Sequence, residues 1–439
     1  MLKDLADITA TFAQRASEHR INPSLDRVRQ VLDALGDPQG MFPSIVIAGT
    51  NGKSSTTKMA DAIARTHGIR SGAYTSPHLV SVTERILIDG LPIADERMVA
   101  ALNEIFPIIL MMEERIGEKL TGFELITVLA LSEFAATPIH MAALEIGIGG
   151  TWDAVNVVDA AVTAITSIDL DHQYWLGDTI TSIAGNKAGV IKPGAITVVQ
   201  KQLPDALEVI ELTAAQMQAT MLLEGRDFSV TSTTAVGGQL INIQTPRERY
   251  QDLFLGVHGA HQAVNAATAL VAVENLLGDD DPLNPVAIGY ALENFRMPGR
   301  LEVVRRSPTV VIDIAHNPAG AQVLATGLAS AMNFNNLTCV FGALDDKDAA
   351  GIVTALAPLV DNWIVTTAPS ERAIAAAELA LEVATVVGSQ RVQLEPNLVA
   401  AFEMAIANAD SYGAGSGVLI TGSATVAGAA RAKFGSSNE

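Results

Sequence analysis

Ser44-Ile-Val-Ile-Ala-Gly-Thr-Asn-Gly-Lys-Ser-Ser-Thr56 is the stretch around which the chain is organised. Its first half is a short apolar run, typical of a buried strand. Gly49 to Gly52 then predicts a tight turn, and apolar residues return at helical spacing after Lys53. The first N–H groups of a helix have no internal partner, and the helix dipole adds positive potential there. This stretch therefore predicts an anion-binding site.

The residues after the turn supply a charge and a metal ligand. Lys53 adds a full positive charge, and the Ser54 hydroxyl can bind Mg²⁺, as in phosphate-binding loops generally. The usual G-x-x-x-x-G-K-[ST] spacing is not met, because Ile47 stands five residues before Gly52. The shorter Gly-Thr-Asn-Gly-Lys-Ser form remains. The alternative is a plain strand-to-helix turn with a solvated lysine.

Composition bounds the class of protein. The 439 residues suffice for two or three domains, with 49% hydrophobic and 17% charged residues. No apolar run reaches the roughly 18–20 residues that span a bilayer, and the acidic N-terminus does not resemble a signal peptide. Cys339 is the only cysteine, which excludes an internal disulfide. The formal charge of −20 argues against nucleic-acid or membrane partners. We expect a cytoplasmic monomer that binds small molecules.

Strand patterns alternate with helical patterns along the chain, and the helical patterns predict, among others, helices at 95–116 and 318–331. The apolar run 139–144 leads into Glu145, and the run 160–165 leads into Asp169-Leu-Asp-His172. Such alternation predicts βαβ units and a mostly parallel sheet, with ligands at the carboxyl ends of the strands. We therefore expect the α/β class, with a P-loop-containing N-terminal domain.

Two domains are predicted from a break in this pattern. Arg296-Met-Pro-Gly-Arg300 reads as a linker, because it combines proline with glycine. We place the N-terminal domain at 1–297, with a small β-rich subdomain at about 196–255. A smaller, Rossmann-like α/β domain at 298–439 follows.

Several polar residues stand at predicted strand ends. Glu145 precedes three glycines, and a carboxylate beside a phosphate loop is a natural Mg²⁺ ligand. Asp313-Ile-Ala-His-Asn-Pro318 gives the second domain an acid and a histidine at the start of a helix. His172 and Lys187 are two further candidates for a functional role, and we expect Lys187 near the start of a helix or in a loop. Their spacing alone does not distinguish His172 from a structural histidine or Lys187 from a solvated surface lysine.

The motifs occur together in one order along residues 20–430. They are Gly49-Thr-Asn-Gly-Lys-Ser, Thr75-Ser-Pro-His-Leu79, Glu84-Arg-Ile86, Phe123-Glu124 with Thr127, Leu144-Glu-Ile-Gly-Ile-Gly-Gly150 with Asp153, Asp171-His172 with Leu176-Gly177, Lys187-Ala-Gly189, His261-Gln262 with Asn265-Ala266, Pro298-Gly-Arg300 and Asp313-Ile-Ala-His-Asn-Pro318. This set resembles the folylpolyglutamate synthase / dihydrofolate synthase branch of the Mur ligase superfamily. The chain departs from many members at Ser54, where they have glycine, and from some at Asn186, where they have glutamate.

The resemblance implies ATP and two Mg²⁺ ions as cofactors. It places the first metal on Ser54, Ser76 and Glu145, and the second on His172 and Lys187. Lys187 looks like the lysine that family members carry as a carbamate, which would convert a cation into an anionic oxygen ligand.

The resemblance also assigns nucleotide and substrate contacts. The loop residues Gly49, Thr50, Asn51, Gly52, Lys53, Ser54 and Ser55 would hold ATP. Asn265 would meet the adenine, Arg300 the phosphates, Asp313 the ribose and His316 the nucleotide near the domain interface. Arg85 and Asp153 would lie toward the pterin-bearing substrate. The expected catalytic set is Lys53, Glu145, His172, Lys187 and His316.

The function that follows is ATP-dependent ligation of L-glutamate to dihydropteroate and/or reduced folates through an acyl phosphate. A cell-wall ligase that uses a UDP-sugar substrate is the alternative enzyme, and a nucleotide-sensing module is the non-enzymatic one. The metal and lysine set speaks against the sensor. For dual activity, candidate pterin contacts are Arg20-Ile-Asn-Pro23, 81–85 and Asp153, although Glu84 and Arg85 alternatively form a surface ion pair.

Overall fold

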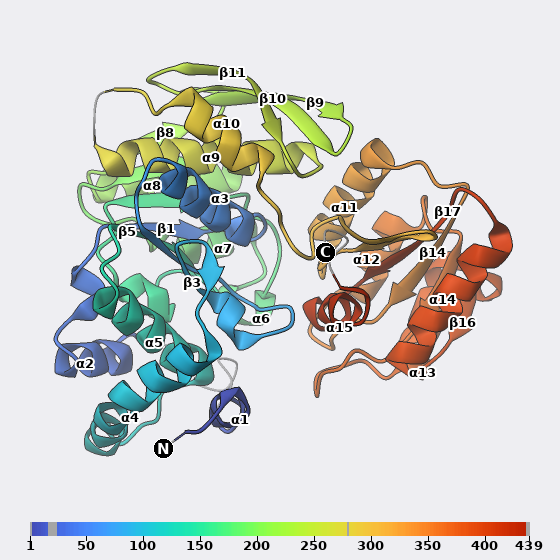
Figure 1. The fold of residues 1–439 in the computed structure, drawn as a ribbon, viewed down its shortest axis with the longest axis horizontal. Helices are drawn as coiled ribbons and strands as arrows, with labels where there is room; N and C mark the ends of the chain where they lie inside the picture. Colours follow the sequence, from blue (N-terminus) through green and yellow to red (C-terminus); the bar gives the residue numbers. More distant parts are fainter. Residues whose placement is uncertain (1, 16–23, 279–280, 436–439) are drawn as a thin grey trace.

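The computed structural model describes residues 2–15, 24–278 and 281–435. The predicted α/β class is confirmed: a larger body with a mostly parallel sheet is followed by a smaller body with a second sheet (Figure 1). The candidate pterin contacts Arg20 to Pro23 lie outside the described residues. No helix within the described ranges is long and apolar enough to cross a membrane.

The larger body contains an eight-stranded sheet in the order β4-β3-β2-β5-β1-β6-β7-β8. Strands β2, β5, β1, β6, β7 and β8 run parallel, and β3 and β4 add an antiparallel edge. Its strands are β1 (Ser44–Ala48), β2 (Ser71–Tyr74), β3 (Ile86–Ile88), β4 (Leu91–Pro92), β5 (Met141–Glu145), β6 (Val162–Ile165), β7 (Ile196–Val199) and β8 (Thr220–Leu223).

Helices cover both faces of this sheet, so its strands are buried on both sides. They are α1 (Leu5–Ala13), α2 (Asp26–Ala34), α3 (Lys53–Thr66), α4 (Asp95–Ile116), α5 (Gly122–Ala136), α6 (Gln173–Leu176), α7 (Ile180–Ala188), α8 (Pro204–Gln216), α9 (Ala260–Leu277) and α10 (Pro285–Glu293), with short 3₁₀ turns η2 (Pro38–Gly40), η3 (Val82–Arg85) and η4 (Ala154–Val157). Figure 1 shows α2, α4 and α5 below the sheet and α9 and α10 above it.

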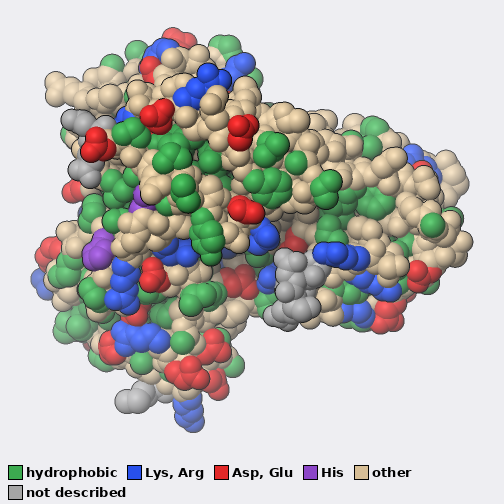
Figure 2. Space-filling view, turned by 45° about the horizontal axis from the view of Figure 1, so that its top comes forward, with side chains coloured by type: hydrophobic (Ala, Val, Ile, Leu, Met, Phe, Trp, Pro, Cys, Tyr) green, Lys and Arg blue, Asp and Glu red, His purple; other side chains and the backbone are tan. Residues whose placement is uncertain are grey.

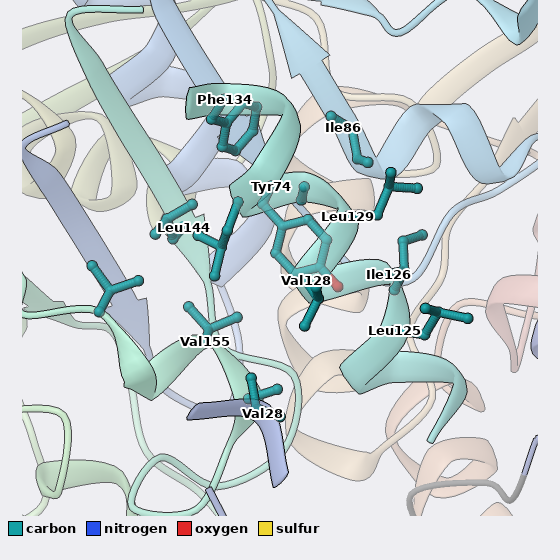
Figure 3. Close-up of a cluster of buried hydrophobic side chains, with 14 of the residues drawn as sticks. Val28, Tyr74, Ile86, Leu125, Ile126, Val128, Leu129, Phe134, Leu144 and Val155 are labelled. Carbon is teal, nitrogen blue, oxygen red and sulfur yellow. The ribbon is translucent and has the colours of Figure 1, made fainter. Parts of the chain in front are cut away.

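The central strand β1 illustrates how the core is divided. Val46 and Ala48 pack into the cluster with α1, α2, α4 and α5, while Ile45 and Ile47 pack into the cluster with α3, α9 and α10. Alternate side chains of a strand point to opposite faces, which accounts for this division. Figure 3 shows part of the first cluster, in which side chains of α5 lie beside Tyr74 and Leu144. Complete burial of each such large apolar side chain contributes about 1.5–3 kcal/mol.

The predicted β-rich subdomain at 196–255 needs correction. β7 and β8 belong to the main sheet, and α8 lies between them with Ala206, Ile210 and Ala214 buried. Only β9 (Ser229–Ala235), β10 (Gly238–Gln244) and β11 (Arg249–Leu255) form the separate antiparallel sheet. The valine- and threonine-rich composition of this region does not distinguish a strand of the main sheet from a strand of a small one.

The smaller body contains a six-stranded sheet in the order β12-β13-β17-β14-β15-β16. All of its strands pair in parallel except β12, which is antiparallel to β13. The elements are β12 (Glu302–Arg306), β13 (Thr309–Ile312), α11 (Pro318–Ala331), β14 (Asn336–Phe341), α12 (Ala349–Leu356), β15 (Asn362–Val365), α13 (Ala376–Val387), η5 (Ser389–Arg391), β16 (Val392–Leu394), α14 (Leu398–Tyr412), β17 (Ser416–Thr421) and α15 (Ala424–Phe434).

Helices α11, α12 and α13 cover one face of this sheet, and α14 and α15 cover the other. The carboxyl ends of its inner strands lead into the loops that hold His316, Lys347 and Ser423, and these loops meet the larger body. On the face in Figure 2, acidic and basic side chains are interspersed over both bodies, so the charge of −20 is not gathered there into one acidic field.

Candidate active site

The phosphate loop is a tight turn between β1 and α3. Gly52 has φ +90°, and a Cβ there would lie 2.6 Å from Asn265 Oδ1. Gly49 has φ +144°, and its Cβ would lie within 1.9 Å of the Thr166 hydroxyl. These positions require glycine on both conformational and steric grounds. Thr50 fixes the turn by donating its N–H to Ser167 O over 2.8 Å.

Lys53 begins α3 and bends back over the loop. Its Nζ donates to the carbonyl oxygens of Gly49 and Thr50, at 3.1 Å each. Burial lowers the pKa of Lys53, while the negative charges of Glu145 and Asp171 oppose that shift. The Lys53 Nζ group therefore lies beside the loop that is predicted to bind an anion, where it bonds to two carbonyl oxygens of that loop.

Glu145 joins the loop to the neighbouring strand end. Its Oε1 accepts from the Ser54 hydroxyl at 2.7 Å, and its Oε2 accepts from the Ser76 backbone N–H at 3.0 Å. The carboxylate is almost fully buried, and burial raises its pKa although Lys53 lowers it. The three residues predicted for the first Mg²⁺ are therefore together, with hard oxygen donors on Ser54 and Glu145. This donor chemistry fits Mg²⁺, which commonly takes one or two carboxylates and completes its shell with phosphates and water.

Lys187 reaches the phosphate loop from α7. It lies in the last turn of that helix, not near its start as predicted, and its Nζ donates to Gly49 O at 2.6 Å. The side chain is buried, and burial together with the charge of Lys53 lowers its pKa to about 7. An ammonium has no lone pair for a metal, so the pair of Lys187 and His172 fits a second Mg²⁺ only if Lys187 carries a carbamate.

Asp171 connects the two bodies. Its Oδ1 accepts from Lys347 Nζ at 2.9 Å and its Oδ2 from Asn317 Nδ2 at 3.0 Å. The Nε2 atoms of His316 and His172 lie 3.7 and 3.8 Å from Oδ2. Burial raises the pKa of Asp171, but the contacts with His316, His172 and Lys347 outweigh it and hold the carboxyl ionised. Burial lowers the pKa of His172 to about 3, so this ring is neutral and able to ligate.

Two cavities meet at the loop. One of about 520 Å³ lies between the bodies and gathers the predicted nucleotide residues Asn51, Gly52, Ser55, Asn265, Arg300 and Asp313. The other, of about 230 Å³, gathers Thr50, Lys53, Ser54, Ser76, Glu145, Asp171, His172, Arg300 and His316. We call them the nucleotide cavity and the reaction cavity. Arg300 lines both, which suits a group expected to meet phosphates.

Asn265 and Asp313 are held from opposite sides of the nucleotide cavity. Asn265 Oδ1 accepts from Gln200 at 3.0 Å, and its Nδ2 donates to Gln262 at 3.2 Å. The Asp313 carboxylate accepts from the N–H groups of Leu301 and Ala315, at 2.9 and 2.8 Å. Burial raises its pKa, and Arg300 counters that shift.

The two predicted pterin contacts differ in placement. Arg85 lines the reaction cavity and donates to His78 Nδ1 at 3.0 Å. Asp153 is buried, and its carboxylate accepts from the N–H groups of Gly147, Ile148 and Val155 at 2.9–3.0 Å. These bonds hold the glycine segment that follows Glu145, so Asp153 has a positioning role in the structure. A direct substrate contact of Asp153 stays a prediction.

Glu84 and Arg85 do not form the ion pair that was the alternative interpretation of these two residues; each has other partners. The Glu84 carboxylate accepts from three backbone N–H groups, those of Leu79, Val80 and Ser81. Arg85 instead donates to His78.

Sequence reasoning missed several residues of the smaller body that line the reaction cavity. They are Lys347, Arg372, Asp346 and Ser423. Lys347 and Asp346 follow β14 and Ser423 follows β17, so their positions at the carboxyl ends of parallel strands are the signal that was available. Asn317, the bridge to Asp171, stood within a quoted motif without an assigned role.

Comparisons with known proteins agree with this geometry. Residues 299–424 match the family model described as Mur ligase, glutamate ligase domain. The fold and site thus define an ATP-dependent ligase. A curated dihydrofolate synthase/folylpolyglutamate synthase of Mycobacterium tuberculosis is 40% identical over 460 residues, covering 99% of this chain and 94% of that protein. The chain belongs to the dihydrofolate synthase/folylpolyglutamate synthase family.

Solved structures support the same assignment. The Mycobacterium tuberculosis folylpolyglutamate synthase complexed with ADP superposes with a TM-score of 0.95 at 40% identity, covering 99% of both chains. Escherichia coli FolC, in complex with DHPP and ADP, gives a TM-score of 0.87 at 29% identity over 98% of this chain and 97% of that one. These matches do not favour the cell-wall alternative.

Proposed function

We propose that this chain ligates L-glutamate to the carboxylate of dihydropteroate and/or reduced folates, at the expense of ATP and through an acyl phosphate. The observation that carries the proposal is the reaction cavity, where Lys53, Ser54 and Glu145 of the larger body face His316 and Lys347 of the smaller one. Family membership and the complexes of its relatives with ADP support it.

The first step transfers a phosphoryl group. An oxygen of the substrate carboxylate forms a bond to the γ-phosphorus of ATP, and the bond to ADP breaks. Such transfers need positioning and charge stabilisation more than covalent help. Lys53 provides the charge when it turns from the loop carbonyls to the phosphates, and Arg300 provides another. Ser54, Ser76 and Glu145 would hold a Mg²⁺ ion, which would stabilise the transferred phosphoryl group as a Lewis acid.

The second step forms the amide. The neutral amine of glutamate attacks the acyl carbonyl, phosphate leaves, and the amine loses a proton. We propose that Lys347 and Arg372 bind the carboxylates of glutamate, because both cations line the reaction cavity. Each is paired with an acid in the structure, Lys347 with Asp171 at 2.9 Å and Arg372 with Asp346 at 3.4 Å. These pairs orient the cations before glutamate arrives.

Lys187 is proposed to carry a carbamate. Its neutral amine would attack CO₂ and lose a proton, which leaves a carboxylate in place of an ammonium. The lowered pKa of about 7 supports this reaction, because the neutral amine is far more abundant near neutral pH than it is for an ordinary lysine. His172 and this carbamate would then hold a second Mg²⁺.

The two bodies are proposed to act as domains, 1–297 and 298–439, that close about 296–300 during turnover. Nucleotide residues fall on both sides of this segment, and the Asp171 contacts join the bodies. Closure would also exclude water, which hydrolyses an acyl phosphate. A cytoplasmic monomer remains our expectation.

The proposal is tested by mass spectrometry of products. The enzyme, ATP and L-glutamate are incubated with dihydropteroate, with tetrahydrofolate, or with a UDP-sugar peptide as the control for the cell-wall alternative. A gain of one glutamyl residue on either pterin substrate, and none on the UDP-sugar, is expected. ATP-dependent modification of the UDP-sugar alone would overturn the assignment.

A further inference from the structure

A third cavity, of about 710 Å³, lies on the other side of segment 76–85 from the reaction cavity. Ser76, Pro77 and Arg85 of this segment line the reaction cavity, whereas Ser81, Thr83 and Glu84 line the third one. Helix α3 runs along both, with Lys53 and Ser54 in the first and Lys58 and Arg65 in the second. Helix α15 does the same, from Ala424 to Arg431, on the side of the smaller body that faces the larger one (Figure 1).

This third cavity is cationic in an acidic protein. Its charged lining consists of Lys58, Arg65, Arg296 and Arg431 against Asp61 and Glu84, a formal charge of +2 in a chain of −20. We call it the cationic cavity. Each of the two acids already has partners. Asp61 accepts from the Ser71 hydroxyl and from Arg65 Nε, and Glu84 accepts from three backbone N–H groups.

The arginines are held in place but retain donors. Among contacts of the described residues, Arg65 uses its Nε for Asp61, Arg431 uses its Nε for Glu302, and Arg296 uses its Nη1 for backbone carbonyls. A guanidinium has five N–H groups, so each fork keeps donors for an anion. Burial lowers the pKa of Lys58 because it disfavours the charged form of the side chain. An anionic ligand beside Lys58 would favour that charged form.

The spacing of the cations favours an extended ligand. Lys58 and Arg65 lie seven residues apart on α3, about 10 Å along the axis and on nearly the same face. A single phosphate does not span such a distance. The lining also includes apolar residues, among them Leu87, Phe295 and Pro298. The lining therefore suits a chain in which carboxylates alternate with methylene groups.

We propose that the cationic cavity binds the oligo-γ-glutamyl tail of polyglutamylated folate. This inference rests on the proposed function, since the tail is its product. A γ-linked glutamyl unit carries one α-carboxylate and two methylene groups, which matches dispersed cations on an apolar wall. Because the cavity contains Arg431 of one body and Lys58 of the other, a bound tail also contacts both bodies.

The site is tested first by binding. Free tetra-γ-L-glutamate is titrated calorimetrically into the full chain at low salt. Lys58→Gln and Arg296→Gln should each weaken binding about fivefold, because each removes one charge contact. Arg29→Gln, an exposed cation on α2, is the matched control and should bind like wild type. Equal weakening in all three variants, or tripolyphosphate binding more tightly than tetraglutamate, would overturn the proposal.

Turnover supplies the second readout. In Lys58→Gln and Arg296→Gln, the KM for a pentaglutamyl substrate should rise about fivefold relative to the KM for the monoglutamyl substrate. An unchanged ratio would refute a tail site. Arg296 is exposed, so its variant keeps the test available if Lys58→Gln fails to fold. Wild type that binds free tetraglutamate but ligates no folate would refute the proposed function alone. Active wild type that does not bind it would refute the cavity assignment alone.

Discussion

Substitution of Gly52 by alanine tests how the phosphate loop depends on Asn265, the residue that we predict to meet the adenine. The Gly52 backbone has φ +90°, and an alanine Cβ would lie 2.6 Å from Asn265 Oδ1. Asn265 is held by Gln200 and Gln262, at 3.0 and 3.2 Å. The added methyl group therefore forces this amide out of its place between two hydrogen bonds.

The expected cost has two parts. A non-glycine residue at positive φ costs about 1–2 kcal/mol, and each disturbed hydrogen bond costs about 1 kcal/mol. Gly52→Ala should thus lower the free energy of unfolding by about 3–4 kcal/mol. Gly68, just after the same helix, has φ +76° with open space around its Cβ position. Gly68→Ala should show only the conformational part, about 1–2 kcal/mol.

The two variants are compared by urea unfolding and by calorimetric titration of ADP. Gly52→Ala should bind ADP at least tenfold more weakly, because the loop and Asn265 both line the nucleotide cavity. Gly68→Ala should bind ADP like wild type. Equal losses of stability in both variants, with unchanged ADP affinity in Gly52→Ala, would refute the steric link between the loop and Asn265.

Four further predictions concern the reaction. Lys187→Ala should abolish turnover and short carboxylic acids should restore part of it, as measured by release of phosphate; full activity without rescue would exclude the carbamate. Lys53→Ala should lower ligation by orders of magnitude while circular dichroism stays native, since Lys53 is the first residue of α3 and its Nζ contacts loop carbonyls rather than the hydrophobic core; wild-type turnover would show that the loop has another role. Small-angle scattering should show compaction about 296–300 when an ATP analogue and folate bind, and an identical profile at saturation would contradict closure. Arg85→Ala should impair dihydropteroate and tetrahydrofolate unequally, whereas wild type active on tetrahydrofolate alone, with bicarbonate present, would limit the enzyme to folylpolyglutamate synthesis.

Elements with strong local signals were predicted closely. The helix predicted at 95–116 is α4, and the one predicted at 318–331 is α11, with the same limits. Gly117 at φ +80° ends the first, and the Asn317 side chain caps the second before Pro318. Such signals act within one turn of helix and do not depend on distant residues.

Elements whose identity depends on neighbours were not predicted. β12 and β16 are edge strands of the smaller sheet, and β7 and β8 were assigned to the wrong sheet. A short strand carries little periodic signal of its own, because its stability comes from the strand beside it.

The sequence by itself determined the phosphate loop and the acids at strand ends. The donors of the loop lie within a few consecutive residues, and topology carries the ends of parallel strands to one edge of the sheet. The direction from which Lys187 enters, and its contact with Gly49, were decided only by the packing of α7.

The meeting of the two bodies was likewise decided only by tertiary structure. Asp171 and Lys347 are 176 residues apart in the chain, yet their side chains lie 2.9 Å from each other. No periodicity encodes such a contact. The contact exists because the carboxyl ends of the two sheets face each other across the boundary between the bodies. Burial disfavours an unpaired charge there, so the charged side chains of one body pair with those of the other.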